Sequence, residues 1–229
     1  MASIPIAECN RVPRFSLVLD LDGTLVDTVP DIAAALNRLM AQRGLPLFSR
    51  PETAAMVGDG VAKLVERAFA ARGVAQDAAA LHDFSRDYTA HVAADSVLYP
   101  GVGEVLQSLD RDGWRLAVCT NKPEAAARAL LEALGVAPLI AAVGGGDSFP
   151  VRKPDPEHVR ATLRQAGGEA TSAVMLGDHA NDVAAAAGVG MPCIFAAWGY
   201  GPLAMAEGAA AVASDMTAVP AIARRLLEG

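Results

Sequence analysis

Cysteine is scarce in this sequence of 229 residues, which contains only Cys9, Cys119 and Cys193. The three cysteines lie far apart, and none forms a CxxC pair or a Cys/His pair with metal-binding spacing. An odd number of widely separated cysteines gives no indication of a disulfide framework. The sequence therefore predicts a protein of a reducing compartment, most simply the cytoplasm.

Positive charge is also in short supply, because 26 acidic residues outnumber 19 basic ones and leave a formal charge of −7. The arginines are scattered without runs, and lysine occurs only at Lys63, Lys122 and Lys153. Proteins bind nucleic acids and anionic membranes through clustered basic residues. We therefore expect neither a nucleic acid nor a membrane as a partner.

Strongly apolar stretches of the membrane-spanning kind are missing as well. Residues 1–14 contain charged residues and two prolines and lack the apolar centre of a signal peptide, which argues against export. Residues 183–206 carry no charge, but they are rich in alanine and glycine and include Pro192 and Pro202. A membrane span needs about 20 strongly apolar residues, so this segment is predicted to form a buried helix, a turn and a strand.

Apolar residues are nevertheless abundant, at 52% against 20% charged residues. This composition lies well outside that of disordered chains and excludes a disordered adaptor. At roughly 150 residues per domain, the length fits either one large domain or one that carries a smaller insertion.

Short apolar runs that stop at polar residues indicate the buried strands of a parallel sheet. These runs cover residues 15–19, 115–119, 173–176 and 191–195. Helical patterns between and after them cover residues 123–134, 155–166, 180–187 and 217–228. The alternation predicts an α/β fold with a Rossmann-like parallel sheet and helices on both faces.

Residues 29–97 interrupt this alternation, because every pattern in them is helical. The expected helices cover residues 32–43, 51–56, 61–71 and 77–93. We therefore predict an all-helical cap domain over residues 28–97, inserted after the first strand. Residues 1–27 and 98–229 would form the α/β core.

Polar side chains follow the ends of the predicted strands, which is where open α/β sheets bind their ligands. They are Asp20, Asp22, Thr120, Asn121, Lys153, Asp178 and Asp182. Four carboxylates in one crevice repel one another unless a cation offsets their charge, and carboxylate oxygens suit Mg²⁺. The sequence therefore predicts a magnesium site. Lys153 and the Thr120 hydroxyl add a positive charge and a donor for the oxygens of a phosphate.

The sequence does not match other known motifs that contain such residues. Residues 20–31 begin like a calcium loop, but Leu25 stands where that loop needs a glycine. Cys119 ends a strand, yet residues 119–125 lack the arginine that closes the loop of cysteine phosphatases. The sequence contains no GxxxxGK, HExxH or GxSxG motif.

Four motifs in a fixed order resemble those of the haloacid dehalogenase-like hydrolases. They are DLDGTLVDT from Asp20, CTNKP from Cys119, KPDP from Lys153 and GDHAND from Gly177. The resemblance covers nearly the whole chain from residue 15. Four ordered motifs with a helical insertion between the first two are highly specific, and they imply a Mg²⁺-dependent phosphatase.

The resemblance also implies a role for each residue. Asp20 would be the nucleophile and form a phosphoaspartyl intermediate, while Asp22 would act first as general acid and then as general base. The metal would be held by Asp20, the main-chain carbonyl of Asp22 and Asp178, with Asp182 positioning Asp178 or a metal-bound water. The transferring phosphoryl group would be held by Thr120, Asn121 and Lys153.

The predicted cap narrows the choice of substrate. TVPDIAAAL from Thr28, VGDG from Val57 and LVERA from Leu64 are similar to phosphoglycolate phosphatases. This similarity implies hydrolysis of 2-phosphoglycolate. The protein is expected to be a monomer or a homodimer. Gly58, Asp59 and Gly60 are expected to lie over the site, although a plain turn between two cap helices also explains them. Pyrophosphate, sugar phosphates and a sugar phosphomutase activity stay open as alternatives.

Functions of other classes are less consistent with the sequence. Dehalogenation needs neither leaving-group protonation nor a metal, so Asp22 argues against it. A phosphonate hydrolase would need a cap lysine, for which Lys63 is the one candidate. A phospho-accepting signalling module or binding protein also gathers aspartates, Mg²⁺, threonine and lysine, but it lacks a helical insertion after the first strand. Repeated release of phosphate would distinguish the enzyme from such a module.

Three of the four histidines are given no role, and a contact of His179 with substrate or water stays open. His82, His91 and His158 are expected on the surface or on a helix face. His179 departs from the resemblance, because relatives usually carry serine or threonine at this position. The departure leaves the expected metal ligands intact but changes what lies beside Asp178.

Overall fold

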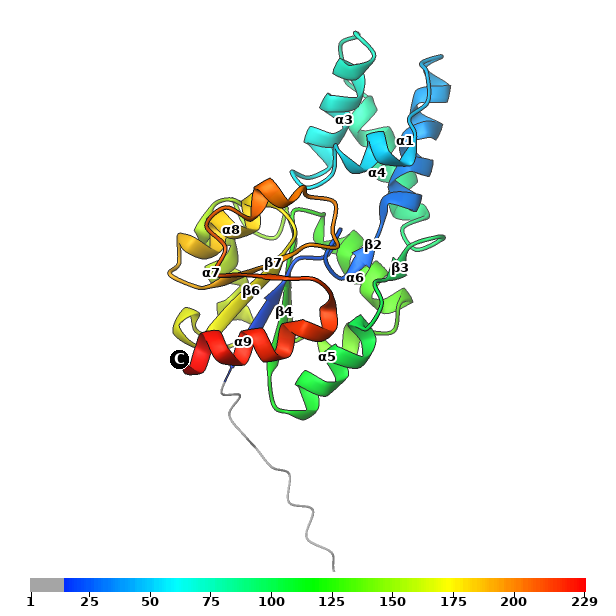
Figure 1. Cartoon of the computed structure of the whole chain (residues 1–229). Coiled ribbons are helices and arrows are strands. Elements are labelled where there is room, and N and C mark those ends of the chain that lie inside the picture. Colours follow the sequence, from blue (N-terminus) through cyan, green and yellow to red (C-terminus); the bar gives the residue numbers. More distant parts are fainter. Residues whose placement is uncertain (1–14) are drawn as a thin grey trace, which may run out of the picture.

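The computed structural model describes residues 15–229, which form a helix-covered sheet with a helical cap at one end (Figure 1). The sheet has six parallel strands in the order β5-β4-β1-β6-β7-β8. The strands are β1 (Ser16–Leu19), β4 (Arg115–Cys119), β5 (Ala142–Gly144), β6 (Ala173–Gly177), β7 (Cys193–Ala196) and β8 (Ala211–Ala213). The predicted α/β fold class with a helical insertion is confirmed.

Strand β1 lies in the middle of the sheet, between β4 and β6. The pairing places Leu19 beside both Val118 and Leu176, so the three strands end at the same level. The chain runs outward from β1 through β4 to β5 and then returns to β6 on the other side of β1. The strand order therefore reverses at β1, and open α/β sheets bind their ligands at such a point.

Helices cover both faces of the sheet. One face contacts α7 (Pro156–Gln165) and α8 (Ala180–Ala187). The opposite face contacts α5 (Val102–Arg111), α6 (Glu124–Ala133) and α9 (Val219–Glu228). Successive side chains of a strand point to opposite faces, so Leu17 and Leu19 pack with the second set of helices and Val18 with the first. Burial on both faces explains why these strands read as unbroken apolar runs.

The cap consists of four helices that follow one another between β2 and β3. They are α1 (Val29–Gln42), α2 (Arg50–Ala54), α3 (Val61–Ala71) and α4 (Ala80–Ala90). At the base of the cap, β2 (Val26–Asp27) pairs antiparallel with β3 (Val97–Leu98). The Asp31 carboxylate in α1 accepts hydrogen bonds from the main-chain N–H groups of Asp95 and Ser96, each at 2.9 Å. These contacts tie together the two places where the chain enters and leaves the cap.

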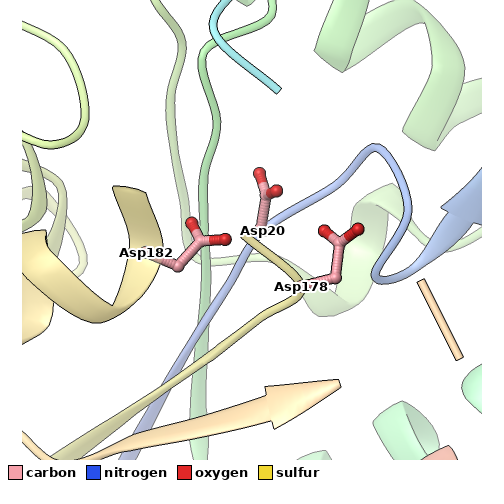
Figure 2. Close-up of side chains that lie close together, drawn as sticks. All are labelled: Asp20, Asp178 and Asp182. Atoms are coloured by element: carbon pink, nitrogen blue, oxygen red, sulfur yellow. The ribbon is translucent and has the colours of Figure 1, made fainter. Parts of the chain in front are cut away.

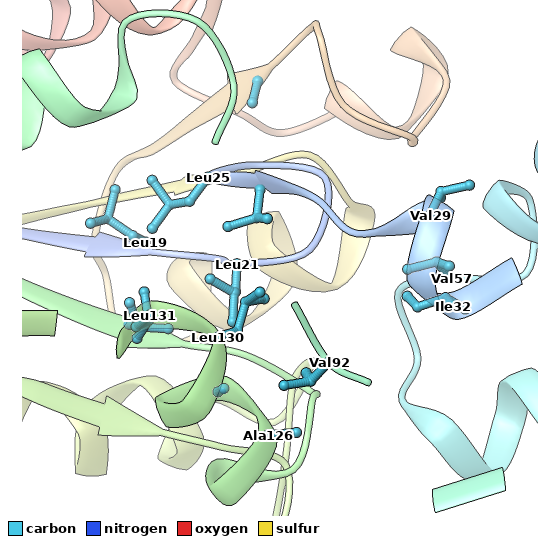
Figure 3. Close-up of a cluster of buried hydrophobic side chains, with 14 of the residues drawn as sticks. Leu19, Leu21, Leu25, Val29, Ile32, Val57, Val92, Ala126, Leu130 and Leu131 are labelled. Atoms are coloured by element: carbon cyan, nitrogen blue, oxygen red, sulfur yellow. The ribbon is translucent and has the colours of Figure 1, made fainter. Parts of the chain in front are cut away.

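One apolar cluster continues from the sheet into the cap (Figure 3). Leu19, Leu21 and Leu25 lie on the core side of this cluster, and Ile32 and Val57 lie on the cap side. All five side chains are at most 8% exposed. The cap is therefore packed against the core rather than held away from it.

The prediction about residues 183–206 can be compared with the described residues. Among residues 15–229, no helix combines the length and apolarity needed to cross a bilayer. The uncharged residues 183–206 form most of α8, the strand β7 and a short helical turn, Leu203–Ala206. The prediction about a signal peptide and the position of Cys9 concern residues 1–14, which lie outside the described part.

Phe195 of β7 is fully buried among the side chains that pack under α7 and α8. Removing its ring leaves a cavity that the surrounding side chains fill only in part. We therefore expect Phe195→Ala to lower the free energy of unfolding by about 3–5 kcal/mol, measured by urea unfolding. The control Leu203→Ala alters a side chain that is 65% exposed, and we expect it to change stability by less than about 0.5 kcal/mol. Equal losses in the two variants would contradict this reading of the core.

Candidate active site

Three buried aspartates meet where β1 and β6 end (Figure 2). Asp20 follows β1, Asp178 follows β6, and Asp182 lies in the first turn of α8. One carboxylate oxygen from each lies within 4.8 Å of the other two. The three residues are 7%, 2% and 0% exposed, respectively. Carboxylates this close and this deeply buried require positive charge nearby.

Lys153 supplies part of that charge. Its Nζ lies 2.7 Å from Asp20 Oδ1 and 2.6 Å from Asp182 Oδ1. Burial alone would lower the pKa of Lys153, but the charges of Asp182 and Asp20 raise it above its ordinary value. Burial and the like charge of Asp20 raise the pKa of Asp178 and of Asp182, and Lys153 opposes this rise at Asp182. One ammonium group does not balance three carboxylates.

Asp178 is held in a fixed orientation by its neighbours. Its Oδ2 accepts hydrogen bonds from the N–H groups of Tyr200 at 2.7 Å and Gly201 at 3.2 Å, and its Oδ1 accepts one from the Thr24 hydroxyl at 3.1 Å. A Cβ on Gly201 would lie 1.9 Å from the main-chain oxygen of Asp178. Gly23, with φ +84°, also lies close, since a Cβ there would lie 2.4 Å from Asp178 Oδ2. Glycine is therefore required at both positions.

The aspartate cluster fits a divalent cation that prefers oxygen. Among residues 15–229, the side chains close enough to share one ion are Asp20, Asp178 and Asp182, so no sulfur or nitrogen ligand takes part. Mg²⁺ and Ca²⁺ are bound by oxygen ligands of this kind. A cation at this position would neutralise the charge that Lys153 leaves unbalanced.

Asp22 does not join this cluster but points to a second lysine. Its Oδ1 lies 2.7 Å from Nζ of Lys122, which also donates a hydrogen bond to the Tyr88 hydroxyl at 2.5 Å. Burial alone would lower the pKa of Lys122, but Asp22 and Tyr88 raise it, so the ammonium group stays charged. Burial raises the pKa of Tyr88 to about 12, and its hydroxyl stays protonated. The carboxylate of Asp22 is therefore paired with Lys122, whereas that of Asp20 is paired with Lys153.

A small cavity lies between the core and the cap beside Asp20 and Asp22. Its volume is about 40 Å³. One water molecule needs roughly 10–15 Å³. The core side is lined by Asp20, Asp22, Thr120, Asn121 and Lys122. The cap side is lined mainly by apolar residues: Ile32, Val57, Val61, Leu64 and Phe84. The cavity therefore joins a polar wall from the core to an apolar wall from the cap.

The cap touches the core loops through the carbonyl oxygen of Gly58. This oxygen accepts one hydrogen bond from the side-chain amide of Asn121 at 3.1 Å and one from that of Asn181 at 2.9 Å. Asn121 also donates to the main-chain oxygen of Lys153 at 3.0 Å. A single cap carbonyl is therefore bound to both the loop after β4 and the start of α8.

The other two residues of the predicted cap loop have different surroundings. Gly60 lines the cavity together with Gly58. The Asp59 carboxylate instead forms an ion pair with Arg67 of α3. Gly58 adopts φ +122°, and a Cβ on it would lie 2.8 Å from the ring of His179. The loop therefore lies beside the site through its two glycines, while Asp59 pairs with Arg67 of the cap.

Of the two positions predicted for His158, the surface or a helix face, the structure shows the second: the residue lies on α7 and is turned away from solvent. The residue is 0% exposed, and its Nδ1 accepts a hydrogen bond from the main-chain N–H of Lys153 at 3.1 Å. Its Nε2 donates to the Gly145 carbonyl at 3.0 Å. His158 therefore fixes the loop that carries Lys153. His82 and His91 are exposed, as predicted.

Burial of His158 makes protein stability depend on pH. Burial and the charge of Lys153 lower the pKa of His158 from 6.5 to about 4. The unfolded chain therefore binds a proton that the folded protein does not, so the contribution of His158 is complete above about pH 6.5 and is lost as the pH falls towards 4. We expect His158→Asn to show a smaller loss of unfolding free energy between pH 7 and pH 5 than the wild type. Urea unfolding at both pH values measures this, and the exposed His82→Asn is the control. A wild-type pH slope in His158→Asn would contradict the assignment.

Comparison with known proteins identifies the family. A profile of the haloacid dehalogenase-like hydrolases matches residues 16–190. The chain belongs to this family. It is 43% identical over 189 residues to a phosphoglycolate phosphatase of Caulobacter vibrioides, covering 81% of this chain and 80% of the relative. It is 42% identical to a phosphoglycolate phosphatase of Rhodospirillum rubrum, covering 89% of this chain and 88% of the relative.

Solved structures of haloacid dehalogenase-like proteins share the fold. A predicted phosphoglycolate phosphatase of Haemophilus somnus superposes with a TM-score of 0.84 at 28% identity, covering 93% of this chain and 99% of its own. CbbY of Rhodobacter sphaeroides, solved with phosphate, superposes with a TM-score of 0.75 at 26% identity, covering 87% of this chain and 93% of its own. The protein is thus a phosphatase of the haloacid dehalogenase-like family that is similar to phosphoglycolate phosphatases. Its buried aspartate cluster is consistent with the metal site of that family.

Several residues around the site were not assigned a role from the sequence. Thr24 and Tyr200 orient Asp178, while Lys122 and Tyr88 surround Asp22. Lys122 carries a sequence signal, because it is one of three lysines and directly follows the polar residues that end β4. The contacts of Tyr88 and Tyr200 come from distant parts of the chain, and no local pattern marks them.

Proposed function

We propose that this phosphatase hydrolyses 2-phosphoglycolate to glycolate and phosphate, with Mg²⁺ as its cofactor. The observation that carries the proposal is the position of Asp20, which lies beside Lys153 and two further aspartates and borders a cavity of about 40 Å³. Such a cavity suits a leaving group as small as glycolate. The identity of about 40% to proteins named phosphoglycolate phosphatase supports the same substrate.

The proposed reaction proceeds in two steps on Asp20. A carboxylate oxygen of Asp20 attacks phosphorus and forms a phosphoaspartyl bond as the bond to the glycolate oxygen breaks. Asp22 gives a proton to the departing oxygen and then removes one from the water that attacks the phosphoaspartyl group. The second step releases phosphate and restores Asp20. Thr120, the main-chain N–H of Asn121 and Lys153 hold the phosphoryl oxygens during both steps.

The proposed ligands of Mg²⁺ are the carboxylates of Asp20 and Asp178 and the main-chain carbonyl of Asp22, supported by Asp182. When bound, the ion offsets the negative charge of the phosphoryl oxygens, which otherwise repels Asp20. The hydrogen bonds from Tyr200 and Gly201 hold Asp178 in one orientation. Asp182 holds Lys153 next to Asp20.

We also propose that residues 28–97 act as a cap on a catalytic core formed by residues 1–27 and 98–229. The apolar cap residues at the cavity exclude water and limit the size of the leaving group. Substrate enters when the hydrogen bonds at Gly58 open, and the cap closes again before the reaction.

Initial rates of phosphate release test the proposal. The substrates are 2-phosphoglycolate, pyrophosphate, glucose phosphates, a sugar bisphosphate and nucleotides, each with Mg²⁺ and with excess chelator. We expect the highest kcat/KM for 2-phosphoglycolate and loss of turnover in chelator. A clear lead for another ester would overturn the substrate assignment, and full turnover in chelator would overturn the cofactor.

A further inference from the structure

Lys122 places a positive charge in the cavity away from the aspartate cluster. Its side chain is 2% exposed, and among the described residues that line the cavity it is the one basic residue. Lys153, the other buried lysine, is bound to Asp20 and Asp182 instead. The two buried lysines therefore contact different aspartates of the site.

The surroundings of Lys122 make its charge costly unless an anion faces it. Its Nζ is bound to Asp22 at 2.7 Å and to the Tyr88 hydroxyl at 2.5 Å. The cap wall opposite consists of apolar side chains such as Ile32, Leu64 and Phe84. An ammonium group in such surroundings interacts more strongly with a nearby anion than it would in water.

Lys122 also lies at the end of the cavity that the leaving group must occupy. Phosphorus has to approach Asp20, and the leaving oxygen has to approach Asp22. The remainder of the leaving group therefore extends past Asp22 towards Lys122 and the cap. When Asp22 turns to the leaving oxygen, Lys122 loses its hydrogen-bonded carboxylate and needs another anionic partner.

We propose that Lys122, held in place by Tyr88, binds the anionic end of the leaving group and selects phosphate esters whose leaving group carries a negative charge. For the substrate proposed above, that end is the carboxylate of glycolate. The inference rests on the proposed roles of Asp20 and Asp22, which set the direction of the substrate in the cavity. A neutral leaving group of the same size leaves the buried ammonium without a partner, and sites built around a polar contact strongly disfavour analogues that lack it.

The test compares two esters of similar size, 2-phosphoglycolate and 2-hydroxyethyl phosphate, in which a hydroxymethyl group replaces the carboxylate. The measured quantity is the ratio of their kcat/KM values. We expect the wild type to favour 2-phosphoglycolate and Lys122→Met to lower the ratio by roughly 10- to 100-fold, the size of one lost hydrogen bond between charged groups. Lys63→Met is the matched control, because Lys63 lies on the cap surface and pairs with Glu66, and its ratio is expected to equal that of the wild type.

Two outcomes overturn the inference. In the first, Lys122→Met loses kcat/KM equally on both esters, which means that Lys122 acts only through Asp22. In the second, the wild type prefers the neutral ester, which means that the cavity does not select a charged leaving group. If Lys122→Met does not fold, Tyr88→Phe carries the test, since it removes one hydroxyl that positions Nζ. We expect its ratio to fall severalfold, and an unchanged ratio overturns the inference.

A failure of the proposed substrate gives a different result. If the wild type favours pyrophosphate over 2-phosphoglycolate, the glycolate assignment is wrong, but the leaving group is still an anion. The ratio of pyrophosphate to 2-hydroxyethyl phosphate then replaces the first ratio. A fall of this ratio in Lys122→Met supports the inference, and an unchanged ratio overturns it.

Discussion

Asp20→Asn is expected to abolish phosphate release, with kcat/KM lower by about 10⁴-fold or more. An amide is a far weaker nucleophile than a carboxylate, so the phosphoaspartyl bond does not form. The asparagine keeps the size of the side chain and an oxygen that accepts a hydrogen bond from Lys153, which lies 2.7 Å from Asp20. We therefore expect the variant to fold. Phosphate release and thermal unfolding of the same preparation measure both expectations.

A control and a trapping experiment strengthen this test. Asp215→Asn changes an exposed aspartate at the start of a short helical turn, and we expect it to retain full activity. Beryllium fluoride mimics a phosphoryl group on a carboxylate, so crystals of the wild type soaked in it should carry the mimic on Asp20. Near-normal turnover of Asp20→Asn, or bare density at Asp20 at saturating reagent, would refute the nucleophile assignment.

Asp22→Asn is expected to slow turnover of 2-phosphoglycolate by about 10²- to 10⁴-fold, the usual contribution of general acid–base catalysis. Asparagine can neither protonate the glycolate oxygen nor remove a proton from water, so both steps slow down. Its oxygen still accepts a hydrogen bond from Lys122, which is 2.7 Å from Asp22. We therefore expect kcat to fall more than substrate affinity. Steady-state rates over a range of substrate concentrations separate the two quantities.

Acetyl phosphate distinguishes the two roles of Asp22. Acetate is a weak base and leaves without protonation, so Asp22→Asn should still form the phosphoaspartyl group from this compound. Hydrolysis of the phosphoaspartyl group should stay slow, because that step needs a base. Rapid mixing should therefore show a burst of about one acetate per active site, followed by slow release. An unchanged kcat on 2-phosphoglycolate would contradict an acid–base role.

The fold could be predicted because its main strands and helices each have a recognisable local sequence pattern. The strands β1, β4, β6 and β7 are buried on both faces and read as apolar runs. Helices between them end near glycine residues, which is a usual C-terminal signal. Parallel strands end on the same edge of the sheet, so the polar residues that follow them can be grouped from their positions in the sequence alone.

Elements with weak local signals were not predicted. Strands β5 and β8 have three residues each and consist of alanine, valine and glycine, so only their neighbours in the sheet make them strands. The pair β2 and β3 has two residues in each strand. Helix α5 is a different case, because Val102, Val105, Leu106 and Leu109 are buried on one face at helical spacing. That pattern is present in the sequence, and the helix could have been predicted from it.

The residues that meet at the ends of β1, β4 and β6 could be grouped from the sequence, but their contacts could not. Lys122 and Asp22 are 100 residues apart, and Asn181 and Gly58 are 123 residues apart. The first pair depends on how β1 and β4 lie side by side, and the second on how the cap is seated on the sheet. Local patterns contain no information about either. His158 shows the same limit, since a histidine on a helix can face either water or the sheet. Its burial follows from the position of α7 against β5.

The short ribbon formed by β2 and β3 has a consequence for how this protein can be altered. Val26 pairs with Leu98 and Asp27 with Val97, so the chain leaves the sheet domain and returns to it at adjacent points. A unit joined in this way can be exchanged at two adjacent points, and we expect such an exchange to leave the pairing of β1 with β4 and β6 unchanged. Chimaeras spliced at the ribbon should inherit the reaction and Lys122 from the parent that supplies the sheet, and the apolar wall of the cavity from the parent that supplies the cap.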